Sequence, residues 1–281
     1  MFKIIEKTVA AEGVHKFVIL SPEIASAALP GQFVVVRLDE KGERIPLTIA
    51  ETEPEKGVIT LFVQEAGKTT KKMCLLNPGD FISDIAGPLG KPSEIEKYGT
   101  VICVGGGVGT AVIYPLAKAL KSAGNRLIVI LGARSKKFII LENEMKSIAD
   151  EFYITTDDGS YGQKGLVTDV IKKLLSTGSQ TFNIVYAIGP IVMMRAVSDT
   201  TAVHGVRTIV SLNPIMVDGT GMCGSCRVTV GGVTKFACVD GPDFDAHAVD
   251  WAELMNRSKF FKDKESLVVV GHKCRLEKDG R

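Results

Sequence analysis

The sequence has little imbalance of charge and few histidines. Its 281 residues include 34 Lys and Arg against 32 Asp and Glu, so the formal net charge is +2, and neither sign forms a long block. Such a balance gives no reason to expect a nucleic-acid surface. The four histidines, His15, His204, His247 and His272, are scattered without ligand spacing, and we assign none of them a catalytic role.

The sequence also lacks an apolar run suited to export or to a membrane. Lys3, Glu6 and Lys7 interrupt the start, where a signal peptide needs an unbroken apolar segment, so we expect the cytoplasm. Residues 100–117 form an uncharged run about as long as the ~18 residues that indicate a membrane helix. Four glycines and Pro115 divide this run, which we interpret as strand, turn and helix.

The pattern of elements predicts an all-β part followed by an α/β part. Residues 1–97 contain short runs rich in β-branched and aromatic side chains between turn residues, which predicts an N-terminal antiparallel β-barrel. In residues 98–211 strands alternate with helices, which predicts a Rossmann-like parallel sheet covered on both faces. Two domains and a small appendage agree with the length.

The C-terminal part is expected to hold a small region and an extension. Residues 212–245 are dense in Gly and Cys and include a predicted hairpin, Arg227–Val230 and Val233–Ala237, turned by Gly231-Gly232. This region is too small for an apolar core of its own, so a metal is the expected stabiliser. In residues 246–281 we expect a helix capped by Asp245 and a last strand-like run, LVVVG.

The strongest chemical signal lies in that Gly- and Cys-rich region. Six cysteines in a reducing compartment are expected as thiols, and the isolated Cys74, Cys103 and Cys274 are interpreted as small buried hydrophobes. The segment DGTGMCGSCRVTVGGVTKFAC instead clusters four potential ligands. These are Asp218, Cys223, Cys226 and Cys238.

The spacing of these four residues favours an iron–sulfur cluster over zinc. Close Cys-x-x-Cys spacing lets two thiolates reach one centre, and the glycines allow a tight loop that directs N–H groups at sulfur. Structural zinc usually draws on a second Cys pair or on His. The long glycine-lined loop favours a 2Fe-2S cluster. Asp218 stands where a fourth cysteine is expected, and an Asp before Gly is also a common turn residue.

Two motifs in the barrel part suggest a flavin. In RIPLTIAE, Arg44 could clamp a pyrophosphate and Thr48 could approach a flavin ring. In GKTTKKMCLL, Gly67 and two threonines open a short helix whose N-terminus favours phosphate. An exposed Arg on a strand and a simple N-cap are the alternatives, and the two motifs together favour the flavin.

A glycine-rich turn in the α/β part predicts a dinucleotide site. VICVGGGVGT carries Gly105, Gly107 and Gly109 between strand and helix, although Thr110 replaces the last glycine of the full fingerprint. Two later strand ends face the same crevice. They contribute Asp157 and Asp158, which could accept ribose hydroxyls, and the segment that contains Gly189 and Pro190. The basic residues Arg134, Lys136 and Lys137 leave the choice between NAD and NADP open.

These motifs, in this order over essentially the whole chain, resemble the ferredoxin-reductase-like electron-transfer subunits, within the dihydroorotate dehydrogenase electron-transfer subunit group. The resemblance implies that FAD is held by Arg44, Pro46, Leu47, Thr48, Gly67, Thr69 and Thr70. It implies that NAD(H) is held by Gly105, Gly106, Gly107, Val108 and Gly109. It implies that Asp218, Cys223, Cys226 and Cys238 ligate the 2Fe-2S cluster.

Within the group, the Asp at position 218 makes the chain similar to one branch, the alpha subunits of NADH-dependent reduced ferredoxin:NADP oxidoreductases. In that branch the cluster is held by one Asp and three Cys. That resemblance implies an oxidoreductase subunit that passes electrons between cluster, FAD and NAD(H), paired with a larger flavin and 4Fe-4S subunit that bifurcates electrons from NADPH. A dihydroorotate dehydrogenase subunit or a sulfide dehydrogenase subunit is the alternative within the family. A zinc-stapled nucleotide-binding regulatory module is the alternative from another class.

Overall fold

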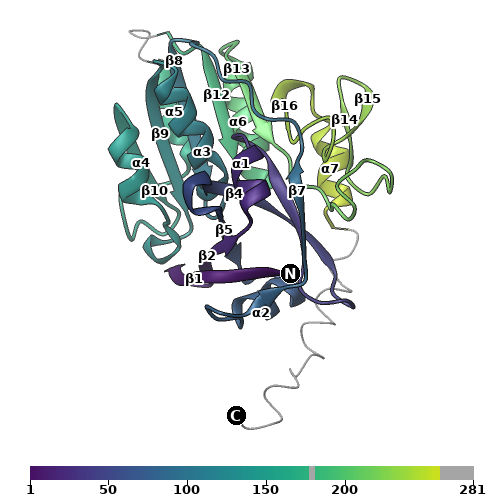
Figure 1. The fold of residues 1–281 in the computed structure, drawn as a ribbon. Coiled ribbons are helices and arrows are strands. Elements are labelled where there is room, and N and C mark those ends of the chain that lie inside the picture. The colour runs from purple at the N-terminus through teal and green to yellow at the C-terminus, as the bar shows by residue number, and fades with distance from the viewer. Residues whose placement is uncertain (177–180, 260–281) are drawn as a thin grey trace.

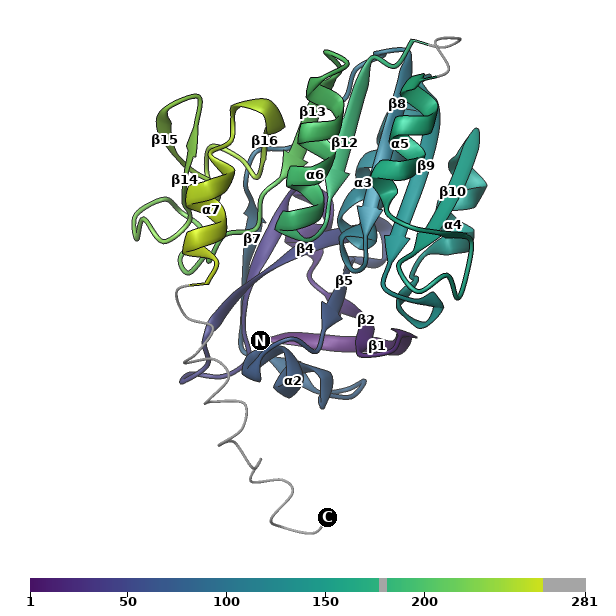
Figure 2. The same ribbon diagram turned by 180° about the vertical axis from the view of Figure 1, so that it is seen from behind.

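The computed structural model describes residues 1–176 and 181–259. Two sheets lie side by side, with a small hairpin region beside both of them (Figures 1 and 2). The predicted strand-like run at 267–270 and Cys274 lie outside the described residues.

The N-terminal sheet is a near-closed antiparallel barrel with the strand order β6-β1-β2-β5-β4-β3-β7. Its strands are β1 (Phe2–Ala11), β2 (Val14–Leu20), β3 (Phe33–Arg37), β4 (Arg44–Glu53), β5 (Val58–Gln64), β6 (Phe81–Ile82) and β7 (Asp84–Leu89). Its helices are α1 (Pro22–Ala27), η1 (Pro54–Lys56) and α2 (Lys68–Cys74). The two edge strands, β6 and β7, are separated in the chain by Ser83 alone, so one continuous segment closes the sheet.

The barrel forms because its strands alternate apolar side chains toward one interior. Phe17, Ile19, Ile59 and Leu61 are fully buried in one cluster, and β2 and β5 pair Phe17 with Leu61 and Ile19 with Ile59. The predicted run KFVILSPEI is only partly strand, because α1 begins at Pro22. Proline suits the first turn of a helix, where its missing N–H has no intrahelical partner.

The second sheet is the predicted parallel sheet, with the order β11-β10-β9-β8-β12-β13-β16. Its strands are β8 (Thr100–Gly106), β9 (Arg126–Ala133), β10 (Glu151–Thr156), β11 (Gln163–Lys164), β12 (Ile184–Ile188), β13 (Arg207–Ser211) and β16 (Asp243–Asp245). Its helices are α3 (Gly109–Ser122), η2 (Lys136–Phe138), α4 (Glu142–Ile148), α5 (Val167–Ser176) and α6 (Ile191–Ala202). The order reverses between β8 and β12, which makes the end of β8 a topological switch point.

Alternating side chains of the parallel strands build two separate cores. Val101 and Cys103 of β8 pack with α3 and α4, whereas Ile102 and Val104 pack with α5 and α6 (Figure 2). This alternation requires helices on both faces of the sheet. The predicted barrel and Rossmann-like sheet are therefore confirmed. No helix among the described residues is long and apolar enough to cross a membrane.

The Gly- and Cys-rich region follows β13. Strands β14 (Arg227–Val230) and β15 (Val233–Phe236) form the predicted hairpin. Strand β16 then pairs antiparallel with β13, which attaches the region to the edge of the parallel sheet. The prediction that Asp245 caps a long helix is wrong. Asp245 caps η3 (Ala246–Ala248), and α7 (Trp251–Arg257) begins later under a second cap, Asp250, whose carboxylate accepts from the N–H of Glu253.

Candidate functional site

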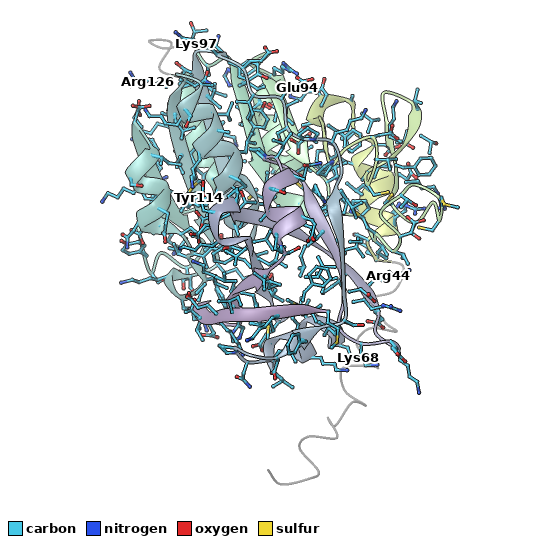
Figure 3. All side chains as sticks on the ribbon, viewed as in Figure 1. Arg44, Lys68, Glu94, Lys97, Tyr114 and Arg126 are labelled. Carbon is cyan, nitrogen blue, oxygen red and sulfur yellow. The ribbon has the colours of Figure 1, made fainter. Side chains whose placement is uncertain are left out.

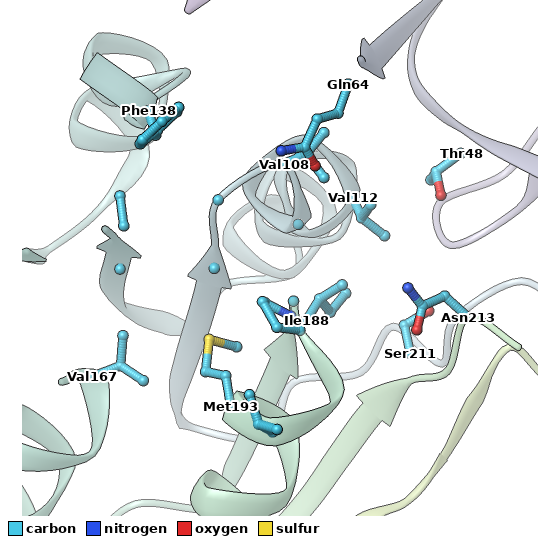
Figure 4. A pocket seen from close by; sticks show the side chains of 18 of the residues that line it. Thr48, Gln64, Val108, Val112, Phe138, Val167, Ile188, Met193, Ser211 and Asn213 are labelled. Carbon is cyan, nitrogen blue, oxygen red and sulfur yellow. The ribbon is translucent and has the colours of Figure 1, made fainter. Parts of the chain in front are cut away.

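A cavity of about 720 Å³ lies between the barrel and the carboxyl ends of the parallel strands. Open α/β sheets bind ligands at this edge, because the loops after the strands diverge at the switch point. The cavity brings together residues of both predicted nucleotide sites, as Figure 4 shows in part. Predicted residues that line it are Pro46, Leu47, Thr48, Gly106, Gly107, Val108, Gly109, Asp157, Gly189 and Pro190.

The glycine-rich turn presents open backbone to this cavity. Gly107 has a φ of +54°, which favours glycine, and a Cβ built on it would meet no atom within 4 Å. A ligand phosphate can therefore approach the backbone before α3 begins at Gly109. Gly105 lies within β8, where it pairs with Ile188, and is not among the lining residues. Asp158 is not among the lining residues either, and its Oδ1 accepts from the N–H of Ser160.

The predicted flavin residues divide between two places. Pro46, Leu47 and Thr48 of β4 line the main cavity, whereas Arg44 lines a second cavity of about 350 Å³ together with Asp218. Figure 3 shows Arg44 on the barrel, on the same side as Lys68 at the start of α2.

The threonines of α2 are engaged within the protein. The hydroxyl of Thr70 accepts from the N–H groups of Ala66 (3.1 Å) and Gly67 (2.9 Å), which caps the helix. The hydroxyl of Thr69 donates to Glu43 Oε2 at 2.6 Å. The cap that the sequence offered as the alternative is therefore present, and the assignment of Gly67, Thr69 and Thr70 to FAD stays a prediction.

Several lining residues were not predicted from the sequence. On the barrel side these include Phe33 and Gln64, and at the end of β13 and just after it they are Ser211, Leu212 and Asn213. In Figure 4, Thr48 lies on one side of the cavity and Ser211 and Asn213 lie opposite. A polar residue at the end of a parallel strand is a signal that points to Ser211, whereas the barrel residues carry no local signal.

The four predicted cluster ligands form two pairs within one region. Asp218 Oδ2 accepts from the N–H of Cys223 at 2.8 Å, and its Oδ1 accepts from Thr220 N–H at 3.0 Å. The sulfur atoms of Cys226 and Cys238 are 3.2 Å apart. Cys226 and Cys238 are each 1% exposed, whereas Cys223 is exposed and Asp218 is half-buried.

The two pairs differ in their electrostatic surroundings. Burial, followed by the neighbouring Cys226 thiol, raises the pKa of Cys238 to about 12. The hydroxyl of Ser225, 3.3 Å from Cys223 Sγ, lowers the pKa of Cys223. The backbone N–H of Thr220, with that of Cys223, lowers the pKa of Asp218. A carboxylate and two thiols in one glycine-lined loop, with the thiol of Cys238 after β15, fit an iron–sulfur cluster, whose thiolate ligands are stabilised by nearby N–H groups.

Family models match the parallel-sheet part of the chain and the Gly- and Cys-rich region that follows it. The model for the iron-sulfur cluster binding domain of dihydroorotate dehydrogenase B matches residues 213–250. The model for the oxidoreductase NAD-binding domain matches residues 103–199. The matched ranges contain the ligand loop and the glycine-rich turn, respectively.

Curated relatives match nearly the whole chain. A protein of Thermotoga maritima, described as a dihydroorotate dehydrogenase B (NAD(+)) electron transfer subunit homolog, is 53% identical over 265 residues, 94% of this chain and 93% of the relative. The dihydroorotate dehydrogenase B (NAD(+)) electron transfer subunit of Fusobacterium nucleatum is 33% identical over 253 residues, 87% of this chain and 96% of the relative.

Solved structures share the architecture. A chain in a structure of the NADH-dependent reduced ferredoxin-NADP oxidoreductase, which was studied for flavin-based electron bifurcation, is 51% identical and has a TM-score of 0.91. The match covers 96% of this chain and 97% of that one. Phthalate dioxygenase reductase has a TM-score of 0.58 at 17% identity, with 89% of this chain and 97% of that one covered, and shows likeness of fold alone.

Proposed function

The chain belongs to the family of dihydroorotate dehydrogenase B electron-transfer subunits, and within that family we propose that it is the NAD-reducing arm of an electron-bifurcating ferredoxin:NADP oxidoreductase. As a member, it is an NAD(H)-dependent oxidoreductase subunit that uses FAD, an iron–sulfur cluster and NAD(H). Electron-transfer subunits work with a partner subunit. The predicted recognition, activity and cofactors are thus confirmed at this level.

The observation that carries the finer proposal is the 51% identity with the ferredoxin-NADP oxidoreductase chain, which is well above the 33% with the F. nucleatum subunit and close to the 53% with the T. maritima subunit homolog. Asp218 supports it, because the carboxylate shares one loop with Cys223 and Cys226. We assign the partner as a larger subunit with flavin and a 4Fe-4S cluster. For the compartment we keep the cytoplasm, since three ligand cysteines must stay reduced.

In this proposal the cofactors supply the redox chemistry, with the flavin converting single electrons to a hydride. The residues of the chain supply binding and orientation. Thr48, Leu47 and Pro46 hold the flavin ring at the barrel wall, and the turn at Gly106–Gly109 receives the pyrophosphate of NAD(H). Asp218, Cys223, Cys226 and Cys238 are assigned as ligands of a 2Fe-2S cluster.

The test is an analysis of the protein purified with its natural partner without oxygen. We expect one FAD and two iron and two sulfide ions per chain of this type, and bleaching of the flavin by NADH. The complex should then reduce both ferredoxin and NAD⁺ when NADPH is supplied. Oxidation of dihydroorotate with no reaction of NADPH would instead support the alternative within the family. Colourless protein without iron or flavin would contradict both assignments.

A further inference from the structure

The main cavity has few groups that can take up a proton. Among the described residues that line it, the ionisable ones are Arg134 and Asp157, at the end of β9 and after β10. Both lie on the side of the parallel sheet away from β13. Near Thr48, where we place the flavin ring, the lining groups that carry exchangeable protons are uncharged, and they include the hydroxyl of Ser211 and the amide of Asn213 (Figure 4).

Oxidation of NADH, the reverse of the proposed reduction of NAD⁺, nevertheless releases one proton for each NADH. When NADH becomes NAD⁺, the C–H bond at nicotinamide C4 breaks and a hydride, one proton with two electrons, passes to the flavin. An iron–sulfur cluster accepts electrons singly and accepts no proton in this scheme. When both electrons have left the flavin, the proton of the hydride has to leave separately, so NADH gives NAD⁺, two electrons and one H⁺. The reverse reaction takes one proton up.

Ser211 connects the cavity to a carboxyl group. Ser211, the last residue of β13, lies opposite Asp243 of β16, and residues opposite one another in an antiparallel pair project to the same face. The Ser211 hydroxyl is near enough to the Asp243 carboxyl to lower its pKa. On the other side, the hydroxyl of Ser93 donates to Asp243 Oδ2 at 2.5 Å. Ser93 and Ser211 are each 8% exposed, whereas Asp243 between them is half-buried.

Asp243 is suited to hold a proton. Burial raises its pKa above the usual value, against the opposing effect of the hydrogen bonds from Ser93 and Ser211, and the charge of Glu94 raises it further. Tyr186 of β12 also faces this carboxyl, and its hydroxyl donates to the carbonyl of Glu94 at 3.2 Å. Glu94 itself is exposed and pairs with Arg207 at 3.3 Å, and the half-buried Asp243 gives the relay its contact with solvent.

We propose that Asp243, together with the hydroxyls of Ser211 and Ser93, forms a proton relay between the cavity and solvent. The relay carries the proton that is released when NADH is oxidised and taken up when NAD⁺ is reduced. A serine hydroxyl can accept one proton while it donates another, so each can pass a proton along without a lasting charge. Asp243 does not line the cavity and acts through Ser211, so it is a positioning residue that holds the proton between the two serine hydroxyls. The inference rests on the proposed function, because it needs both a hydride donor and an acceptor of single electrons.

The experiment separates hydride transfer from proton release. In anaerobic stopped-flow measurements on the holo-complex, NADH first reduces the flavin, and ferricenium, a one-electron oxidant, then reoxidises it in the presence of a pH indicator. In Asp243→Asn we expect proton release and reoxidation to slow by on the order of 10²-fold, the scale of general acid–base effects. Reduction by NADH should stay within about twofold, because hydride transfer needs no proton from the relay.

Two variants and one control keep the result interpretable. Ser211→Ala should slow proton release in the same way while it keeps the carboxyl, so a shared defect cannot come from loss of Asp243 alone. Asp245→Asn, on the same strand, should behave as wild type, since asparagine also caps helices well. Thermal unfolding followed by circular dichroism excludes variants that fail to fold.

A readout independent of turnover is the infrared difference spectrum between oxidised and reduced protein. Wild type should show the C=O band of a protonated carboxyl whose intensity changes with reduction, and Asp243→Asn should lack that change. The pH dependence of the flavin midpoint potential should lose an inflection in the same variant. Wild-type proton release and an unchanged band in Asp243→Asn would overturn the relay. Failure of NADH to bleach the flavin of the wild type would overturn the proposed function instead.

Discussion

The four proposed cluster ligands form a buried half, Cys226 and Cys238, and a more exposed half, Asp218 and Cys223. The two halves differ in how extensively they pack against the rest of the protein. Cys226 and Cys238 lie in the core that α5 and α6 share with the parallel sheet, together with Phe33 and Val35 of the barrel. Cys223 is exposed and Asp218 is half-buried, and the two are held by hydrogen bonds within the loop. Asp218, the one proposed ligand that is not a thiol, stands in the more exposed half. A carboxylate there keeps part of its hydration, whereas one in the buried half would lose it at a large cost.

The largest difference between the halves should be in the free energy of unfolding when one cysteine of each half is replaced by serine. Cys226→Ser and Cys223→Ser should both lose most of the iron, because serine is a poor substitute for a thiolate ligand. In cluster-free protein, Cys226→Ser should also lower the free energy of unfolding by about 1–3 kcal/mol, since a hydroxyl is buried without a defined partner. Cys223→Ser should stay within about 0.5 kcal/mol of wild type, as is usual for surface sites.

Urea unfolding of the apo-proteins, with iron and sulfide analysis of the holo-proteins, measures both effects. Equal stability of the two apo-variants would contradict the division into a buried and an exposed half.

The docking of the exposed half on the barrel depends on Gly219. Gly219 has a φ of +76°, and a Cβ there would lie 2.5 Å from Leu89 Cδ1 and 3.3 Å from Val35 Cγ2. Gly219→Ala should destabilise the protein by about 1–3 kcal/mol, from backbone strain and overpacking together. Gly232→Ala is the matched control, because Gly232 has the same φ of +76° but no atom within 4 Å of its added Cβ. If the two variants unfold at the same urea concentration, the contact with the barrel contributes nothing.

The carboxylate of Asp218 should affect the cluster more than the fold. Asp218→Ala removes a ligand and the acceptor for two N–H groups, so we expect weaker retention of iron, by at least the roughly 10–100-fold that outer-shell partners cost. Asp218→Cys should keep the cluster with a changed absorption spectrum and potential, since ligand softness and charge both change. Iron titration and anaerobic spectroelectrochemistry check these outcomes. A spectrum unchanged in Asp218→Cys would remove Asp218 from the ligand set.

The smallest test compares the two thiol environments directly in cluster-free, reduced protein. The thiolate is the reactive form, and lowering a pKa increases the thiolate fraction at neutral pH. Iodoacetamide at pH 7 should therefore modify Cys223, whose pKa is lowered, before Cys238, whose pKa is about 12. Reaction at Cys238 should rise as the pH approaches that value. Mass spectrometry of peptides resolves the sites, and equal rates at pH 7 would contradict the assigned environments.

Local signals in the sequence were sufficient for much of the fold. The strand, turn and helix at 100–122 and the hairpin turned by Gly231-Gly232 were predictable because glycine positions and side-chain periodicity are properties of a short segment. The pairing of β16 with β13 was not, because three residues carry no periodic pattern and their partner is chosen by tertiary packing. The helix start at Trp251 was missed because Asp245 and Asp250 are both acceptable caps.

The candidate site divides in the same way. Gly107 and Thr48 were found because a glycine-rich turn and a hydroxyl four positions after Arg44 are each visible in one segment, and they line the cavity. Arg44 and Asp218 are 174 positions apart in the sequence and share a second cavity, which no local pattern indicates. Ser211 acquires its proposed role only through Ser93 and Asp243, which come from two other parts of the chain.

Strand β16 has a consequence for how such proteins can be recombined. Strand β16 completes the edge of the sheet beside β13. The segment that carries the proposed ligands is therefore bonded to the NAD-binding sheet and cannot be exchanged as an independent unit. A chimera that exchanged residues 213–242 alone between relatives would keep β16 and lose the packing matched to it. Exchange from the loop before β13 through α7 would transfer the paired strands β13 and β16 together. We expect these hybrids to fold.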